Sequence, residues 1–255
     1  MALNPDPMSA VQIAFVPLTG VVEHGLSLRS GAAQTQALWL LQAVTSGVWR
    51  NGQPVELADL TVAQFDGCLA ALYRSLYGER LPSEGTCTSC SEPFELSFDL
   101  GDLQERLMQD VVGFEGDHDG QITAPSGRVF RLPRVVDLEQ LPLMDPEDWL
   151  RALLESGDFD GAALQDEIAA AGPVLSQNID APCPMCGHVN AVRFDMAAYL
   201  VGTLEREVAF VWREVHLIAL HYGWLLDDIL ALSRDLRRKL TGLIVGEASR
   251  MRMVS

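Results

Sequence analysis

Several stretches of the 255-residue chain place apolar residues at helical spacing. The first runs from about Ala32 to Ser46, and Gly47 is expected to end the helix. A second helix is predicted to begin at Thr61, because Thr61 and Gln64 form a capping-box pattern before an apolar run that reaches Tyr77. Both helices should therefore bury one face against the rest of the protein.

Acidic and small residues mark the boundaries of the later helices. One helix is predicted to begin at Asp145, since Pro146 suits the first helical position, and to end near Gly157. Gly223 should interrupt the helical sequence near the C-terminus. The other predicted helices are Asp160 to Ala171, Met196 to His221, Asp227 to Leu232 and a last one that starts near Ser233.

Alternation of apolar and polar residues predicts strands. The segment from Phe94 to Leu100 alternates regularly, and the segments 129–132 and 192–194 have the same character. Residues 1–28 hold a mixed apolar segment with Pro17, which predicts strand and turn. The remaining predictions are a short helix at 101–112 and a loop at 113–127.

The composition indicates a folded protein with an acidic surface. Hydrophobic residues make up 48% and charged residues 21%, and the net charge is −17. Between Glu84 and Glu167 there are 20 acids against five Arg. This charge argues against nucleic acid as a partner, because phosphate binding relies on clustered Lys and Arg. No apolar run is long enough for a membrane span. The odd number of cysteines, their metal-type spacing and the lack of a secretory leader predict a reducing, cytoplasmic location.

The C-terminal residues have the opposite charge. From Arg234 to Arg252 there are six basic residues against two acids. We therefore expect the last helix to be a basic amphipathic element that docks to an acidic groove on a partner. The alternative is that the C-terminal helices only form an intramolecular core.

Four of the five cysteines occur as two Cys-x-x-Cys pairs, Cys87/Cys90 and Cys183/Cys186. Two residues between paired cysteines let one tight turn present both thiolates to the same ion. A structural zinc site takes four such ligands, so one pair is half a site and two pairs complete it. We therefore predict one structural Zn²⁺ per chain, held by all four residues.

The two pairs belong to a longer repeated pattern. Phe98-Asp99-Leu100 begins eight residues after Cys90, and Phe194-Asp195-Met196 begins eight residues after Cys186. Each half is therefore a knuckle, a strand, a Phe-Asp-apolar segment and a helix. Matched halves of this kind suit a zinc ribbon, in which two knuckles face each other across one ion. The 92 residues between Cys90 and Cys183 would then form an inserted subdomain.

Other chemistry for the cysteines fits their surroundings less well. A redox pair of the thioredoxin type starts a helix, whereas both pairs here lead into alternating strands. A further alternative is that the cysteines are buried residues that bind no metal. His188 is a fifth candidate ligand, a donor to a thiolate or an ordinary partly exposed residue. Cys68 is predicted to be a small core residue.

No motif indicates catalysis. The chain has no Gly-x-Gly-x-x-Gly, P-loop or Gly-x-Ser-x-Gly sequence. His216 and His221 are five residues apart and so do not share a helix face, and Asp227 and Asp228 suit a helix cap better than acid/base catalysis. We therefore predict a protein that is not an enzyme and has no small-molecule substrate.

Together these elements predict an α+β fold that is mainly helical. Its helices should surround a small zinc-ribbon-like β element formed by the two CxxC knuckles. The predicted parts are an N-terminal segment and first helix at 1–60, a helix and first knuckle at 61–100, an inserted acidic, mainly helical subdomain at 101–180, and a second knuckle with the C-terminal helices at 181–255.

Seven blocks between Val62 and Ile244 carry a resemblance to a known family. They are Ala71 to Gly78, Phe130 to Pro133 with Asp137-Leu138, Cys183 to His188, Phe194 to Met196, Trp212 to His216, Tyr222 to Trp224, and Ile229 to Ser233 before Arg237-Arg238. Their order resembles the base-plate, or hub-assembly, proteins of contractile-tailed phages and of related phage-tail-like injection systems. The first 60 residues show no match, and Ser91 stands where the family usually has Gly.

The resemblance implies a non-enzymatic protein needed to build the base plate, with the four cysteines at the family's metal positions. Its partners would be other base-plate or hub proteins. It would either be incorporated into the particle or act as an assembly chaperone in the cytoplasm. The alternative function is a zinc-ribbon adaptor or regulator that acts on a nucleic-acid-associated complex.

Overall fold

The computed structural model of the chain describes residues 11–109, 111–116, 121–140 and 143–254. These residues form an α+β structure of helices and small antiparallel sheets, as predicted. The chain folds into two compact units: unit 1 comprises residues 1–13 and 48–196, and unit 2 comprises residues 14–47 and 197–255. None of the helices in the described ranges is long and apolar enough to cross a membrane.

Helix α3 (Val62–Tyr77) is the last helix of the chain before the first cysteine pair. Thr61 Oγ1 accepts the backbone N–H of Gln64 at 3.2 Å, and Gln64 Oε1 accepts the N–H of Thr61 at 3.2 Å. The predicted capping box is therefore confirmed. Gly78 ends the helix with a φ of 86°, a positive value that glycine adopts without steric cost.

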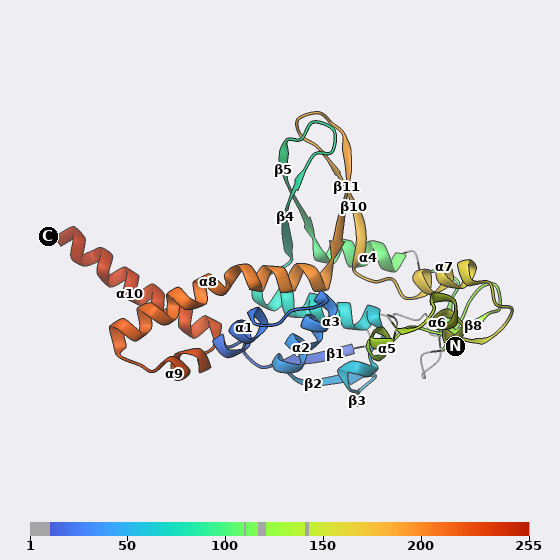
Figure 1. Cartoon of the computed structure of the whole chain (residues 1–255), viewed down its shortest axis with the longest axis horizontal. Coiled ribbons are helices and arrows are strands. Elements are labelled where there is room, and N and C mark those ends of the chain that lie inside the picture. The colour runs from blue at the N-terminus through green and yellow to red at the C-terminus, as the bar shows by residue number, and fades with distance from the viewer. Residues whose placement is uncertain (1–10, 110, 117–120, 141–142, 255) are drawn as a thin grey trace. The chain divides into compact units, whose positions relative to one another are not determined.

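Two β-hairpins of unit 1 stand side by side (Figure 1). The first pairs β4 (Arg80–Thr86) with β5 (Pro93–Asp99), and the second pairs β10 (Ser176–Pro182) with β11 (Val189–Asp195). Both predicted strands that follow the cysteine pairs are thus present, as β5 and β11. A helix begins directly after each hairpin, and these helices are α4 (Leu100–Gln109) and α8 (Met196–Tyr222).

Between the hairpins the chain builds a small sheet with its own hydrophobic core. The sheet order is β6-β7-β8-β9, and Phe130 and Leu153 are fully buried in the hydrophobic core. The predicted loop at 113–127 is wrong where it contains strands, since β7 pairs with β8. The elements are β6 (Glu115–Gly116), β7 (Gln121–Thr123), β8 (Val129–Arg131), α5 (Val135–Gln140), α6 (Pro146–Leu153), β9 (Leu154–Ser156) and α7 (Gly161–Ala171).

Unit 2 is built from helices. Its elements are α1 (Gly20–Ser27), α2 (Ala33–Val44), α8 after Met196, α9 (Leu226–Ala231) and α10 (Arg234–Val254). Val211, Val215 and Ile218 of α8 pack with Ile229 and Ile244 in one buried cluster. The long and C-terminal helices were predicted almost to their observed bounds.

The N-terminal predictions need two corrections. The strand β1 (Val11–Phe15) is present, but α1 occupies part of the segment that was predicted as turn; residues 1–10 lie outside the described part. Helix α2 ends at Val44, earlier than predicted, because the chain continues as β2 (Thr45–Arg50), which pairs with β3 (Gln53–Pro54). Pairing with another segment has overridden the local helical pattern.

The expected basic face of the last helix is wrong for two of its arginines. Arg237 is completely buried and the side chain of Arg234 is 4% exposed, and both pair with the buried carboxylate of Glu23. A charged side chain can be buried in this way only when it is paired. These arginines therefore belong to the core of unit 2 and not to a docking surface.

Candidate metal centre

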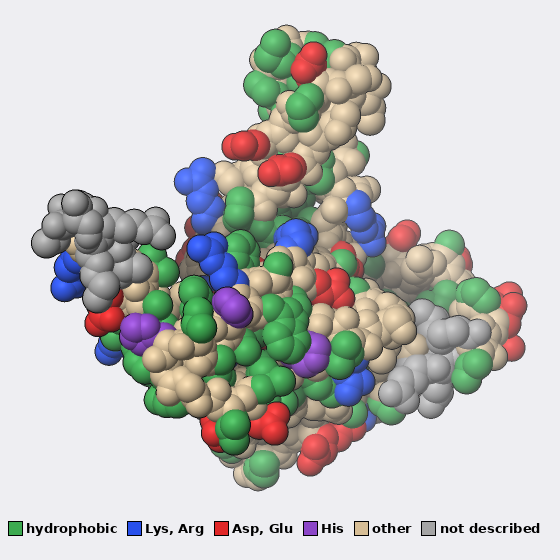
Figure 2. All heavy atoms as spheres, turned by 60° about the vertical axis from the view of Figure 1, so that its left-hand side comes forward, with side chains coloured by type: hydrophobic (Ala, Val, Ile, Leu, Met, Phe, Trp, Pro, Cys, Tyr) green, Lys and Arg blue, Asp and Glu red, His purple; other side chains and the backbone are tan. Residues whose placement is uncertain are grey.

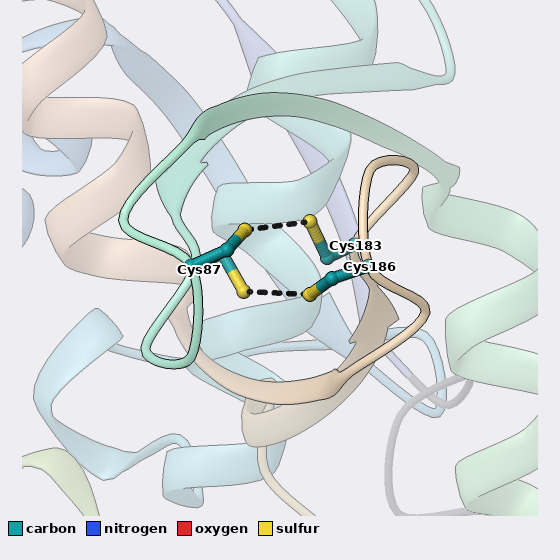
Figure 3. Close-up of side chains that lie close together, drawn as sticks. Cys87, Cys183 and Cys186 are labelled. Carbon is teal, nitrogen blue, oxygen red and sulfur yellow. Dashed lines mark hydrogen bonds between the residues drawn. The ribbon is translucent and has the colours of Figure 1, made fainter.

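The cysteine pairs occupy the tips of the two hairpins, and the two tips have the same backbone hydrogen bonds. In each hairpin the first cysteine donates its N–H to the residue five positions further on. Cys87 donates to the carbonyl of Glu92 at 2.9 Å, and Cys183 donates to the carbonyl of His188 at 2.8 Å. Each tip therefore closes into a tight turn that turns both of its thiols toward the other hairpin (Figure 3).

The residue after the second cysteine has a positive φ in both tips. The φ of Ser91 is 61° and that of Gly187 is 74°. Each donates its N–H back to the carbonyl of the first cysteine at 2.9 Å. Glycine adopts this conformation freely, whereas a residue with a Cβ atom is strained there. Ser91, which stands where the resembled family usually has Gly, therefore fits its position less well than Gly187 does.

All four predicted ligands meet in one cluster. Their Sγ atoms lie within 4.8 Å of one another, and the Cys87–Cys186 and Cys90–Cys183 sulfur pairs are each 3.7 Å apart (Figure 3). A tetrahedron of sulfurs at about 2.3 Å from a central ion has edges of about 3.8 Å. The four thiols, which form no disulfide, are therefore placed to hold one metal ion.

The cluster is buried on one side and open on the other. Cys87 and Cys183 are 1% and 2% exposed, whereas Cys90 and Cys186 are exposed. The backbone N–H of Cys90 donates to the Cys87 sulfur and lowers the pKa of Cys87 to about 6. Desolvation opposes this effect, and the N–H of Ser89 adds to it. The N–H of Glu92 favours the thiolate of Cys90, but desolvation and the neighbouring thiols raise its pKa to about 12. Crowded thiols cannot all ionise without a compensating cation.

Asn190 connects the two tips beside the thiols, and its side chain is 4% exposed. Its Oδ1 accepts the N–H and the hydroxyl of Thr88 from the other hairpin, at 2.9 and 3.0 Å. Its Nδ2 lies 3.8 Å from Cys87 Sγ and 3.3 Å from the carbonyls of Ala181 and His188. Such outer contacts orient the ligands of a metal site. The sequence pattern did not single out Asn190.

The hairpins repeat each other with a constant offset of 96 residues along the chain. The pairs Arg80↔Asp99 and Ser176↔Asp195 occupy the same place in the two registers. Even the cross-strand hydrogen bond recurs with its ends exchanged. Arg80 donates to Ser97 in the first hairpin, and Arg193 donates to Ser176 in the second, at 2.7 and 2.8 Å. The repeat therefore extends from the tips to the bases of both hairpins.

Two other sequence candidates do not join the cluster. The Nε2 atom of His188 lies 3.0 Å from Thr88 Oγ1, so this side chain faces the other tip and not the thiols. Cys68 is 3% exposed on α3, and burial raises the pKa of its thiol to about 12. A neutral buried thiol of this kind is a core residue, as predicted.

Comparison of the chain with models of protein families, with curated proteins and with solved structures finds no match.

Proposed function

We propose that the four cysteines bind one structural Zn²⁺ ion that joins the two hairpins. The observation that carries this proposal is the spacing of the thiols, whose Sγ atoms lie within 4.8 Å of one another. Four thiolates in a tetrahedron suit zinc, or iron in a similar site. With four protein ligands the ion has no open position for water or substrate, so its role is structural and not catalytic.

Metal analysis of the purified full-length chain tests the assignment. We expect about one zinc per chain, lost in Cys90→Ser and Cys183→Ser, because either change removes a ligand. Cys68→Ala is the matched control, since Cys68 lies outside the cluster, and it should keep the metal. Iron in place of zinc would overturn the choice of metal, and unchanged zinc in Cys183→Ser would overturn the site.

We propose further that the chain is a non-enzymatic assembly protein of the base plate of a contractile phage tail or a phage-tail-like injection system. Its support is the sequence resemblance that runs from about Val62 to Ile244. The zinc-joined hairpins would provide a rigid element within such a protein. The residues of the two tips, 86–93 and 182–189, include no Lys or Arg. This composition favours a protein partner over nucleic acid.

Particle assembly tests this role. The chain would be co-expressed with the sheath, tube and base-plate proteins of a contractile system, and complete particles would be counted by electron microscopy. We expect Cys68→Ala to support assembly and Cys183→Ser to fail. Complete particles without the chain would refute the role. Binding of duplex DNA at physiological salt would instead favour the zinc-ribbon adaptor or regulator.

A further inference from the structure

Helix α8 separates its charges onto different faces. It carries two Arg-Glu neighbours, Arg206-Glu207 and Arg213-Glu214. Consecutive residues of an α-helix differ by about 100° in direction, so the members of each pair cannot share a face. Glu214 is 8% exposed, and Glu207 is half-buried, whereas both arginines are exposed. The acids therefore face inward and the arginines face outward.

The inward acids are paired with arginines of α10. Glu214 Oε2 accepts from Arg237 Nε at 3.0 Å, and Glu207 pairs with Arg234. Arg238 Nη2 lies 3.4 Å from Glu207 Oε1, and Arg238 Nε lies 3.8 Å from Glu214 Oε1. The arginines of α10 thus neutralise the acids of α8. Among the residues that the structure describes, the arginines of α8 pair with no acid, and Arg206 Nη2 donates instead to Thr203 Oγ1 at 3.0 Å.

The helix face that carries these arginines forms a single stripe, which we call the α8 stripe: Arg206, Phe210, Arg213, Leu217 and Leu220. Four of these residues are exposed, whereas Leu217 is partly buried because it also packs against the hydrophobic cluster of unit 2. They recur every three or four residues, so they line one face of the helix. Phe210 is 55% exposed and Leu220 is 75% exposed. Within the described ranges neither Arg206 nor Arg213 forms an ion pair. The view in Figure 2 brings the α8–α10 end forward and shows hydrophobic, cationic and His side chains close together.

We propose that the α8 stripe binds an acidic amphipathic helix of a partner protein. A helix that lays its apolar face along the stripe would cover Phe210 and Leu220. Arg206 and Arg213 are seven residues apart, or about 10 Å along the axis. Carboxylates at the same spacing on the partner would meet both guanidinium groups, which bind carboxylates in a forked geometry.

Charge distinguishes this partner from other anionic surfaces. Unit 2 has nine basic and eight acidic residues and so a net charge of +1, whereas unit 1 carries −18. Screening over about 8 Å at physiological salt makes a small ligand respond mainly to the local arginines. A bilayer or a duplex binds through many phosphates, and two arginines neutralise few of them. A single acidic helix fits the limited extent of the stripe.

This inference goes beyond the proposed zinc site and assembly role, because it identifies the chemistry of the partner. Binding can be measured on isolated full-length protein with synthetic probes. We would use a fluorescent helical peptide with Leu at the contact positions and Glu beside them. Two peptides with Gln or Lys in place of every Glu are the comparison. Because this assay contains no base-plate component, its result does not depend on whether the protein assembles base plates.

We expect the Glu peptide to bind more tightly than the Gln peptide and the Lys peptide to bind least. Arg206→Glu combined with Arg213→Glu should weaken binding of the Glu peptide by at least roughly tenfold and favour the Lys peptide. Phe210→Ser should weaken binding of both the Glu and the Gln peptides. Lys239→Glu, a charge reversal at one exposed site of α10, is the control and should leave the affinity within about twofold.

Several outcomes would overturn the proposal. These are no binding of the Glu peptide at millimolar concentration, equal binding of the Glu and Lys peptides, or an equal loss in Lys239→Glu. Dimerisation that Phe210→Ser abolishes would show instead that the stripe contacts a second copy of the chain. Sedimentation with phosphatidylserine vesicles that depends on Phe210 would show a membrane site. Circular dichroism of each variant confirms the fold, and Arg206→Gln with Arg213→Gln replaces the charge reversal if that variant unfolds.

Discussion

The rings of Phe98 and Phe194 meet edge to face, with centroids 5.1 Å apart and an interplanar angle of 85°. The two residues occupy the same position in β5 and β11, at the ends of the hairpins away from the cysteines. The hairpins are therefore joined at both ends: by this aromatic pair at the base and by the thiols and Asn190 at the tips.

Removal of either ring should loosen the hairpins of unit 1. Phe194 is 5% exposed, so Phe194→Ala should lower the free energy of unfolding by about 3 kcal/mol, and half-buried Phe98→Ala by less. A double-mutant cycle in urea should give a coupling of about 0.5–1.5 kcal/mol. Phe210→Ala, at an exposed ring of unit 2, should change stability by no more than about 0.5 kcal/mol. Strict additivity of the two hairpin variants would refute the contact.

Asn190→Ala should weaken metal binding without removal of a ligand. The change removes the acceptor of Thr88 and the donor beside Cys87 Sγ, so the tips lose their direct connection. Loss of an outer contact of this kind typically lowers metal affinity by about 10- to 100-fold. Competition with a chromophoric chelator measures the affinity. Asn178→Ala, at an exposed position of β10, should have no effect. Equal affinities for Asn190→Ala and the unmodified protein would show that Asn190 only fills space.

Ser91→Gly should stabilise the first knuckle. Ser91 has a φ of 61°, and an L-residue with a Cβ atom pays roughly 1 kcal/mol in this region, a penalty that glycine avoids. We expect a gain of that size in the metal-bound protein, measured by urea unfolding. Thr88→Gly, in the same tip, is expected to destabilise, since it adds backbone freedom and removes the bond to Asn190. A loss of stability in Ser91→Gly would contradict the strain.

Local sequence patterns were sufficient for the parts of the structure that depend on nearby residues. The capping box at Thr61 and Gln64 is a contact over three positions, and each cysteine pair forms one tight turn. The equal spacing of Phe98 and Phe194 after their cysteines also indicated that the two halves match. The four ligands of the candidate site could therefore be predicted, although 92 residues separate Cys90 from Cys183.

Contacts between distant segments were not predictable in the same way. Glu115–Gly116 and Gln121–Thr123 are too short and polar to show a strand pattern, and they are strands because each pairs with a neighbour. Arg234 follows the pattern of an exposed helix face, yet its partner Glu23 is 211 residues away. Asn190 likewise resembles a loop residue in the sequence, because its role depends on a hydrogen bond with Thr88 of the other hairpin.

Asp66 on α3 should make unit 1 less stable as the pH rises toward neutrality. It is 7% exposed, and desolvation raises its pKa to about 7. The negative charge of Asp195 also raises this pKa, whereas the hydrogen bond from the N–H of Leu175 at 2.7 Å lowers it. The unfolded carboxyl titrates near 3.8, so between about pH 4 and pH 7 only the folded state holds the proton. This contribution to stability is full below pH 4 and is lost as the pH rises through 7.

Asp66→Asn should remove this pH dependence, because the amide stays neutral and its oxygen can still accept the N–H of Leu175. Urea unfolding at pH 5, 6, 7 and 8 should show that the variant gains stability relative to the unmodified protein as the pH rises. Asp158→Asn, at an exposed position, is the control and should run parallel to the unmodified protein. Parallel curves for Asp66→Asn as well would show that Asp66 titrates normally.

Arg237 should be among the most sensitive positions of unit 2. Its side chain is fully buried, and its Nε donates to Glu214 at 3.0 Å while its Nη2 pairs with Glu23. Burial raises the pKa of Glu23, although the positive charges of Arg237 and Arg234 lower it. Arg237→Met would leave buried carboxylates without their partner, which should cost about 3–5 kcal/mol. Arg238→Met, whose side chain is 45% exposed, should cost at most about 1 kcal/mol.

The same contacts decide what a truncated chain would do. Truncation after Ser233 removes Arg234 and Arg237 together, so Glu23 and Glu214 lose their buried partners. It also removes Ile244 from the buried cluster that contains Val211, Val215 and Ile218. We therefore expect unit 2 to unfold, with loss of helical circular dichroism, while the cysteine cluster of unit 1 still binds one metal ion. If Glu23→Gln and Glu214→Gln restore most of the stability lost in Arg237→Met, the uncompensated charges are the cause. A truncated chain with intact helical signal would show instead that α10 is a separable docking element.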